Sequence, residues 1–253
     1  MPNSTTQLSA QPMNTIGDID EWVKSNRLHW AGQTILPWDE KLFLEVAPFV
    51  TSHFWSDRHS INVYSVIGTA HPDFVYLSWD QFLATGQRMS FNKRLLHANP
   101  GYYLETDVKH PSMLYVSLDG EGWYVNGDGN HRTCLARFHF EQLNANGIPS
   151  KTMIHGVTVD SYRVDWALLE LYRRIQRALR AGRGKHAGHL ECARVHVARE
   201  NGPAWKLDSY KPFLRYVQAD GVVMKLDRES ATSLLVQLEH RSNTGFLGRL
   251  LGR

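Results

Sequence analysis

The sequence predicts an α+β protein. Two apolar runs, "SMLYVSL" and "GWYVNG", are separated by Asp119, Gly120 and Glu121, which is typical of a β-hairpin. Further along, "DWALLELYRRIQRALRAGRGKH" carries apolar residues at helical spacing on one face and arginines on the other. A second hairpin and a last helix are predicted in the stretch that begins at residue 209. Hairpins with helices between them favour a sheet with helices packed on it.

Composition sets the outer limits. The chain has 253 residues, 42% of them hydrophobic, which is enough for one large domain or for one domain with an extension. Its formal charge is only +3, so anion binding has to come from local clustering. Cys134 and Cys192 are too few for a disulfide framework or a thiolate zinc site, which favours a reducing compartment.

The elements before the first hairpin are predicted from turn and capping signals. Residues 1–16 are polar and are expected to form a flexible arm. A helix is expected in "IDEWVKSNRLHW", and the tryptophans around it are interpreted as packing anchors. Strands are expected in "INVYSVIG" and "FVYLS", and a short helix in "SWDQFLATG", with Ser78 as its N-cap and Gly86 as its stop. Another helix, "NKRLLHANPGYYLE", is broken at Asn99-Pro100-Gly101.

The hairpin leads directly into "GDGNHRTCLARF", where glycines precede a predicted helix that ends at Gly147. The first turn of a helix carries unpaired N–H groups and the positive end of the dipole, so it attracts phosphate or carboxylate. Gly127 and Gly129 let the main chain approach an anion closely, Arg132 adds donors, and His131 can carry a proton. Asp128 fits a metal or base ligand, or a residue that stabilises the turn. Ordinary turn chemistry before a helix remains the structural alternative.

The hairpin, the glycine turn and "GNHR" at the start of a helix resemble the ParB/sulfiredoxin fold, whose members carry Gly-x-His-Arg or Gly-Glu-Arg-Arg sequences there and bind nucleotide phosphate. The matching residues are Gly129, Asn130, His131 and Arg132. Within that superfamily, "YVNGDGNHRTCLARF" is most similar to the plasmid fertility-inhibition factors of the Osa/FiwA type. The resemblance covers about residues 58–163.

This resemblance implies a ParB/sulfiredoxin-like core, a small mixed sheet with flanking helices, followed by an α/β extension. It also implies ATP hydrolysis, DNA cleavage and interference with DNA transfer through type IV secretion, with coupling or relaxosome proteins as possible partners. The expected division is an arm at 1–16, a core with an aromatic-rich N-terminal segment at 17–163, and a C-terminal extension at 164–253. The expected nucleotide ligands are Gly127, Gly129, Asn130, His131, Arg132 and Thr133.

Asn130 departs from the pattern. Sulfiredoxins have a cysteine at this place, and Asn130 cannot form the corresponding sulfur intermediates, so peroxiredoxin repair is not expected. Asn130 also cannot act as a general base. The hydrolytic carboxylate is expected from Asp128 first and from Glu121 or Asp119 second, with Asp128 as ligand of Mg²⁺ or another divalent metal. His131 and Arg132 complete the expected catalytic set.

The amphipathic helix is the expected DNA-binding element. Its cations and those of the glycine-rich segment after it are Arg173, Arg177, Arg180, Arg183 and Lys185. A solvated charged face is the alternative. The sequence shows no apolar run long enough to span a bilayer and no apolar signal centre, so a cytoplasmic location is expected, with the inner membrane surface as a second option for the tail "GFLGRLLGR". A non-catalytic DNA-binding or protein-binding adaptor that blocks a secretion or partition component is the alternative function.

Overall fold

The computed structural model describes residues 17–147, 152–181 and 188–250, with side chains up to residue 240. It is a mixed α+β structure, as the sequence predicts. The helices are α1 (Ile19–Ser25), α2 (Glu40–Val46), α3 (Trp79–Thr85), α4 (Met89–Ala98), α5 (Asn130–Ala145), α6 (Trp166–Ala181) and α7 (Arg228–Leu250), with 3₁₀ turns η1 (Ala47–Phe49) and η2 (Val63–Ser65). The strands are β1 (Leu36–Pro37), β2 (Val50–Asn62), β3 (Val66–Thr69), β4 (Leu114–Leu118), β5 (Trp123–Val125), β6 (Met153–Val164), β7 (His189–Gly202), β8 (Trp205–Val217) and β9 (Val223–Leu226).

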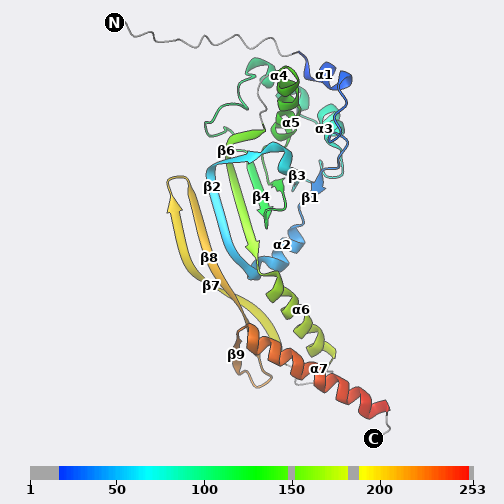
Figure 1. Cartoon of the computed structure of the whole chain (residues 1–253), viewed down its shortest axis with the longest axis vertical. Coiled ribbons are helices and arrows are strands. Elements are labelled where there is room, and N and C mark those ends of the chain that lie inside the picture. The colour runs from blue at the N-terminus through cyan, green and yellow to red at the C-terminus, as the bar shows by residue number, and fades with distance from the viewer. Residues whose placement is uncertain (1–16, 148–151, 182–187, 251–253) are drawn as a thin grey trace.

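Within the described residues the strands form one nine-stranded sheet in the order β1-β3-β5-β4-β6-β2-β8-β7, and β9 pairs with β8. The pairs β1–β3, β3–β5 and β4–β6 are parallel, whereas β4–β5, β2–β6, β2–β8 and β7–β8 are antiparallel. Figure 1 shows α1, α3, α4 and α5 at one end of the sheet and α6 and α7 at the other. The sheet therefore links two helical ends.

The main hydrophobic cluster surrounds α5. Leu135 and Phe138 of α5 are fully buried against sheet residues such as Tyr115 and Val159. A buried cation also lies in this cluster, because the Arg137 guanidinium sits 4.6 Å and 4.2 Å from the ring centroids of two tryptophans and donates to the Val66 carbonyl. The central helix is thus buried along most of its length, and its C-terminal end is exposed.

A second cluster lies at the other end of the molecule. It joins η1 to α6, α7 and the lower parts of β7 and β8, with Phe49, Ile175 and Leu214 among its buried residues. Because β8 pairs with β2, the sheet continues across the boundary expected at residues 163 and 164. The extension therefore shares its sheet with the segment that precedes it.

Most predicted elements are confirmed. Ser78 caps α3 in a capping box and Gly86 ends it. The chain leaves α4 at Asn99, immediately before Pro100-Gly101. The central hairpin, the helix after it, the amphipathic α6, and the last hairpin and helix are all present.

Other expectations are wrong in detail. "FVYLS" is a turn, not a strand, in which Tyr76 has φ 66° and its N–H donates to the Ile35 carbonyl. Its apolar side chains still pack against the core. The sequence therefore has the apolar pattern of a strand, although the backbone is not extended. The helix predicted to reach residue 30 ends at Ser25, and a 3₁₀ turn divides "INVYSVIG". Most of β2, and all of β7, were not predicted from the sequence. The arm at 1–16 lies outside the described residues.

Candidate functional site

The glycine turn between β5 and α5 has the backbone that the sequence indicates. Gly127 has φ 107° and Gly129 has φ 115°, both in the region that side chains disfavour. The turn is fastened to β4, because the Leu114 N–H donates to the Asp128 carbonyl and the Asn126 N–H donates to the Leu114 carbonyl. Gly129 is the N-cap of α5 and offers no side-chain acceptor. Among the described residues, none caps the first turn of this 16-residue helix through a side chain.

Asn130 and Thr133 are used inside the protein. The Asn130 amide accepts a hydrogen bond from Thr69 Oγ1 at 2.6 Å and donates to the Gly127 carbonyl at 3.1 Å, which ties the turn to β3. Thr133 is fully buried, and its hydroxyl lies 2.7 Å from the Tyr115 hydroxyl. In this conformation neither side chain reaches a ligand, although both were expected to bind nucleotide.

Arg132 is also held internally. Its guanidinium donates to the Tyr102 hydroxyl, to the Pro111 carbonyl and, at 2.9 Å, to the Ser112 carbonyl. It further lies 3.2 Å from the Asp128 carboxylate, and only 11% of its side chain is exposed. Arg132 therefore joins the start of α5 to the loop before β4. The expected phosphate contact would require it to leave partners that it already has.

Asp128 lies at the rim of the turn. One carboxylate oxygen accepts the Gly129 N–H at 2.6 Å, the other faces Arg132, and 60% of the side chain is exposed. The carboxylate therefore stabilises the turn, which is one of the roles that the sequence left open, and its role as a metal or base ligand stays a prediction. The described residues contain no group of three or more His, Cys, Asp or Glu side chains arranged to hold a metal ion.

His131 lies between two aromatic rings, with Arg88, His71 and Asp128 as its charged or titratable neighbours. Its ring lies 5.2 Å from the Phe74 ring and 5.1 Å from the Phe82 ring, and Nε2 accepts the Arg88 N–H at 3.4 Å. Burial lowers the pKa of His131, and the nearby positive charges of Arg88 and His71 lower it further. The imidazole is therefore neutral near pH 7. Arg88 is exposed and forms no ion pair with another described residue.

Arg88 and His71 were not among the predicted site residues. His71 follows β3, whose parallel neighbour β5 leads into the glycine turn. Because parallel strands end at the same edge of a sheet, the loop after β3 had to lie near the loop after β5. That rule could have found His71 once β3 was assigned, whereas nothing in the sequence pattern identifies Arg88, which precedes α4.

The hairpin carboxylates lie elsewhere. Asp119 and Glu121 are at the other end of β5 from Asp128, a separation of roughly 10 Å or more for a three-residue strand and its flanks. The Asp119 carboxylate accepts hydrogen bonds from the Val164 N–H and from Trp166 Nε1. The structure does not bring either hairpin residue together with Asp128, so Asp128 is the carboxylate available at the turn.

The expected DNA-binding helix has much of its charge neutralised. Arg173 pairs with Glu45 at 2.7 Å, and Arg177 pairs with Glu170 at 3.0 Å. Arg180 is exposed, while Arg183 and Lys185 lie outside the described residues.

The scan against protein-family models and the searches of curated proteins and of solved structures found no match to this chain. No helix of the described residues combines the length and the apolar character needed to cross a bilayer.

Proposed function

We propose that this protein binds nucleotide phosphate at the N-terminal turn of α5 and hydrolyses ATP there. The observation that carries the proposal is a glycine turn before an uncapped helix start, with one exposed arginine and two histidines beside it. The turn lacks a side-chain cap, two left-handed glycines precede it, and Arg88, His71 and His131 surround it. Backbone N–H groups, a helix dipole and an unpaired arginine together form an anion-binding arrangement.

Each residue has a defined part in this proposal. The first N–H groups of α5 hold the phosphate oxygens, the backbone angles of Gly127 and Gly129 let the phosphate approach the turn, and Arg88 neutralises its charge. His131, which is neutral near pH 7, accepts a proton from the attacking water or orients that water. Arg132 acts as a positioning residue, because it fixes the helix start through the Pro111 and Ser112 carbonyls.

Asp128 fits a divalent ion such as Mg²⁺. Its carboxylate oxygens are the hard ligands that Mg²⁺ prefers, most of the side chain is accessible, and Mg²⁺ sites commonly use one or two protein carboxylates with substrate phosphates. When bound, the ion supplies charge neutralisation for phosphoryl transfer, a reaction that mainly requires positioning and electrostatic stabilisation.

The wider proposal is a plasmid fertility-inhibition factor that hydrolyses ATP and cleaves DNA, and that acts on a coupling or relaxosome component of type IV secretion. The resemblance of "YVNGDGNHRTCLARF" to the Osa/FiwA type, and of residues 58–163 to the ParB/sulfiredoxin-like core, supports this proposal. The cytoplasm, or the inner membrane surface, is the location that such a role requires.

The test uses purified protein with ATP, Mg²⁺ and supercoiled plasmid. Arg88→Ala is expected to raise the KM for ATP about tenfold, the usual scale for one charged hydrogen-bond partner. Asp128→Ala is expected to remove Mg²⁺-dependent hydrolysis. Arg180→Ala is the matched control, since Arg180 is exposed on α6 and far along the chain from the turn. Hydrolysis that is unchanged in both Arg88→Ala and Asp128→Ala would refute the site.

A non-catalytic adaptor is the second candidate. The observation that favours it is that Arg132, Asn130 and Thr133 are all satisfied by protein groups. In that case the purified protein would show no ATP-dependent turnover, and ATP would not shift its thermal unfolding, yet it would still bind DNA or a transfer protein. A ligand-induced rise in melting temperature would contradict the adaptor.

A further inference from the structure

Four aromatic side chains form a row across the face of the sheet on which α5 packs. Trp123 of β5 lies 6.2 Å from His59, His59 lies 5.4 Å from Phe54, and Phe54 lies 6.3 Å from Trp205 of β8, all measured between ring centroids. These four residues are called the ring row. All four are half-buried, so each ring keeps an accessible part.

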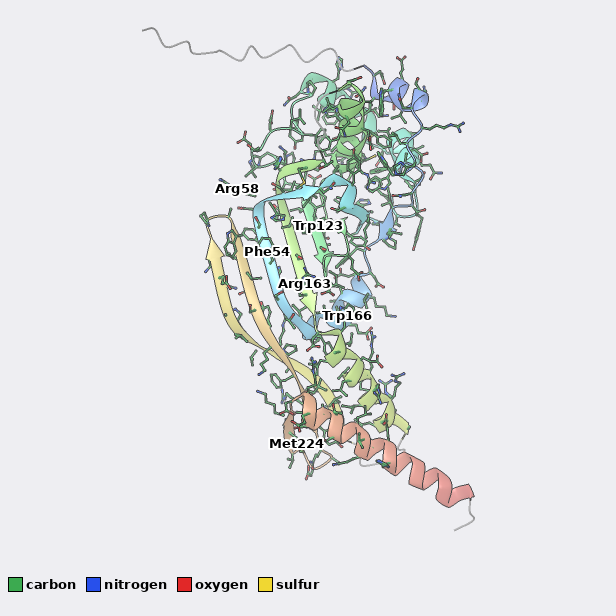
Figure 2. All side chains as sticks on the ribbon, in the orientation of Figure 1. Phe54, Arg58, Trp123, Arg163, Trp166 and Met224 are labelled. Atoms are coloured by element: carbon green, nitrogen blue, oxygen red, sulfur yellow. The ribbon has the colours of Figure 1, made fainter. Side chains whose placement is uncertain are left out.

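The ring row lies beyond the cover of the helices. Phe54 is paired in register with Ser161 on β6 and with Leu207 on β8, which places it in the middle of the long strands. Figure 1 shows no helix over the middle of β2 or over the neighbouring part of β8. Phe54 and Trp123 also pack against the main hydrophobic cluster, so each presents only part of its side chain. Figure 2 places Phe54 and Trp123 over this middle part of the sheet.

Two cations lie on the same face. Arg163 follows Ser161 by two positions on β6, and Lys211 follows Leu207 by four positions on β8, so both share the face of Phe54. Both are exposed, and neither forms an ion pair within the described part of the chain. Arg163 donates only to the Asp119 carbonyl among its described contacts. The acidic residues near the row are Asp57, on β2 between Phe54 and His59, and Glu200, opposite Leu207 on β7.

This face differs from α6, the helix from which DNA contact was expected. Arg173 and Arg177 already have carboxylate partners, whereas Arg163 and Lys211 form no ion pair among the residues that the structure describes. A polyanion gains more from unpaired cations, because no intramolecular ion pair has to be broken.

We infer that this face binds single-stranded nucleic acid, with bases stacked on the ring row and phosphates held by Arg163 and Lys211. Stacking on aromatic side chains is the usual recognition of unpaired bases, because every base has a π-face, and a duplex keeps its bases stacked inside. The identity of the ligand rests on the DNA-directed function proposed above, but the surface is separate from the α5 turn.

The test measures fluorescence anisotropy of a labelled oligothymidine of about 20 nucleotides, longer than the ~4–16 nucleotides that one OB-fold covers. The double variant Arg163→Gln/Lys211→Gln is compared with Arg177→Gln/Arg180→Gln, which removes the same charge from α6. The first is expected to weaken binding at least about tenfold and to reduce the slope of log affinity against log salt by about 1.4, from ~0.7 for each lost phosphate contact. The second is expected to change neither quantity appreciably.

Phe54→Leu keeps an apolar side chain but removes the π-face, so it is expected to weaken binding without changing the salt slope. Equal loss in the two double variants, tighter binding of a duplex than of the single strand, or no binding by the parent protein would each overturn the inference.

ATP hydrolysis measured on the same preparations separates the two proposals. If hydrolysis is absent throughout while single-strand binding falls in Arg163→Gln/Lys211→Gln, the phosphate site fails and the sheet surface stands. If hydrolysis is normal in every variant and single-strand binding is unaffected by them, only the sheet surface fails.

Discussion

Replacement of Arg132 by Met should destabilise the fold strongly. The side chain is nearly buried, and its guanidinium supplies the donors for the Pro111 and Ser112 carbonyls and for the Tyr102 hydroxyl. Methionine has a similar length but no donor. The variant therefore leaves three acceptors without their partner, and leaves Asp128 without its cation.

The expected magnitude follows from these contacts. A hydrogen bond from a charged donor contributes about 1.5–3 kcal/mol, and removal of one member of a buried charged network typically costs ~3–5 kcal/mol. Pro111 and Ser112 are exposed residues, so water can replace part of the lost bonding. We therefore expect the free energy of unfolding to fall by about 3 kcal/mol, a large share of the ~5–15 kcal/mol that stabilises a typical domain.

Urea unfolding followed by far-UV circular dichroism gives the difference, with Arg180→Met as the control for loss of an exposed arginine. The control is expected to stay within about 0.5 kcal/mol of the parent protein. A change below about 1 kcal/mol in Arg132→Met would refute the structural role, because a cation so little needed by the fold would be free to serve a ligand.

Gly129→Ala should lower the free energy of unfolding by ~1–3 kcal/mol, because φ is +115° and the new Cβ would lie 3.3 Å from Met113. Thermal or urea unfolding measures the change. Gly32→Ala is the control and should not be destabilised, since no heavy atom lies within 4 Å of the added Cβ. Burial lowers the pKa of His139, so the unfolded chain takes up its proton first and stability should fall as pH drops below about 6.5, by at most ~1.4 kcal/mol per pH unit for this group. Urea unfolding at several pH values should show a smaller slope in His139→Gln, and an unchanged slope would contradict this assignment. Arg137→Lys should cost about 2 kcal/mol, since an ammonium group cannot stack flat between two indole rings and also reach the Val66 carbonyl; a melting temperature equal to that of the parent would argue against it.

Local signals predicted much of the secondary structure. Ser78 and Gly86 mark the two ends of α3. The Ser78 side chain caps the first turn and Gly86 is the C-cap, and both effects depend only on residues within one helical turn. The hairpin and the turn at Gly127 to Gly129 follow from residues that tolerate the required backbone angles. The strand predicted in "FVYLS" is wrong because its apolar side chains pack against the core from a turn. That turn is held by backbone hydrogen bonds to a distant residue, Ile35, which local signals do not reveal.

The candidate site was predictable only in part. The location at the start of α5 followed from glycines and a helix start, and the structure has both there. The hydrogen-bond partners of the site side chains could not be predicted from the sequence. Those of Arg132 come from residues 102, 111 and 112, and those of Asn130 include Thr69, all of them distant along the chain. The backbone N–H of Arg88 contacts His131 because the segment between α3 and α4 packs beside the start of α5, which the sequence does not reveal.

By itself, the sequence determined where this chain turns, where its longest helices begin, and that a glycine turn lies before α5, because these depend on the conformational preferences of neighbouring residues. Only the tertiary structure decided which charges stay free. It buried Arg132 among carbonyls, paired Arg173 and Arg177 with carboxylates, and left Arg88, Arg163 and Lys211 without ion pairs among the described residues. Whether a charge is available to a ligand depends on groups that are distant along the chain and come together only when the sheet and helices pack.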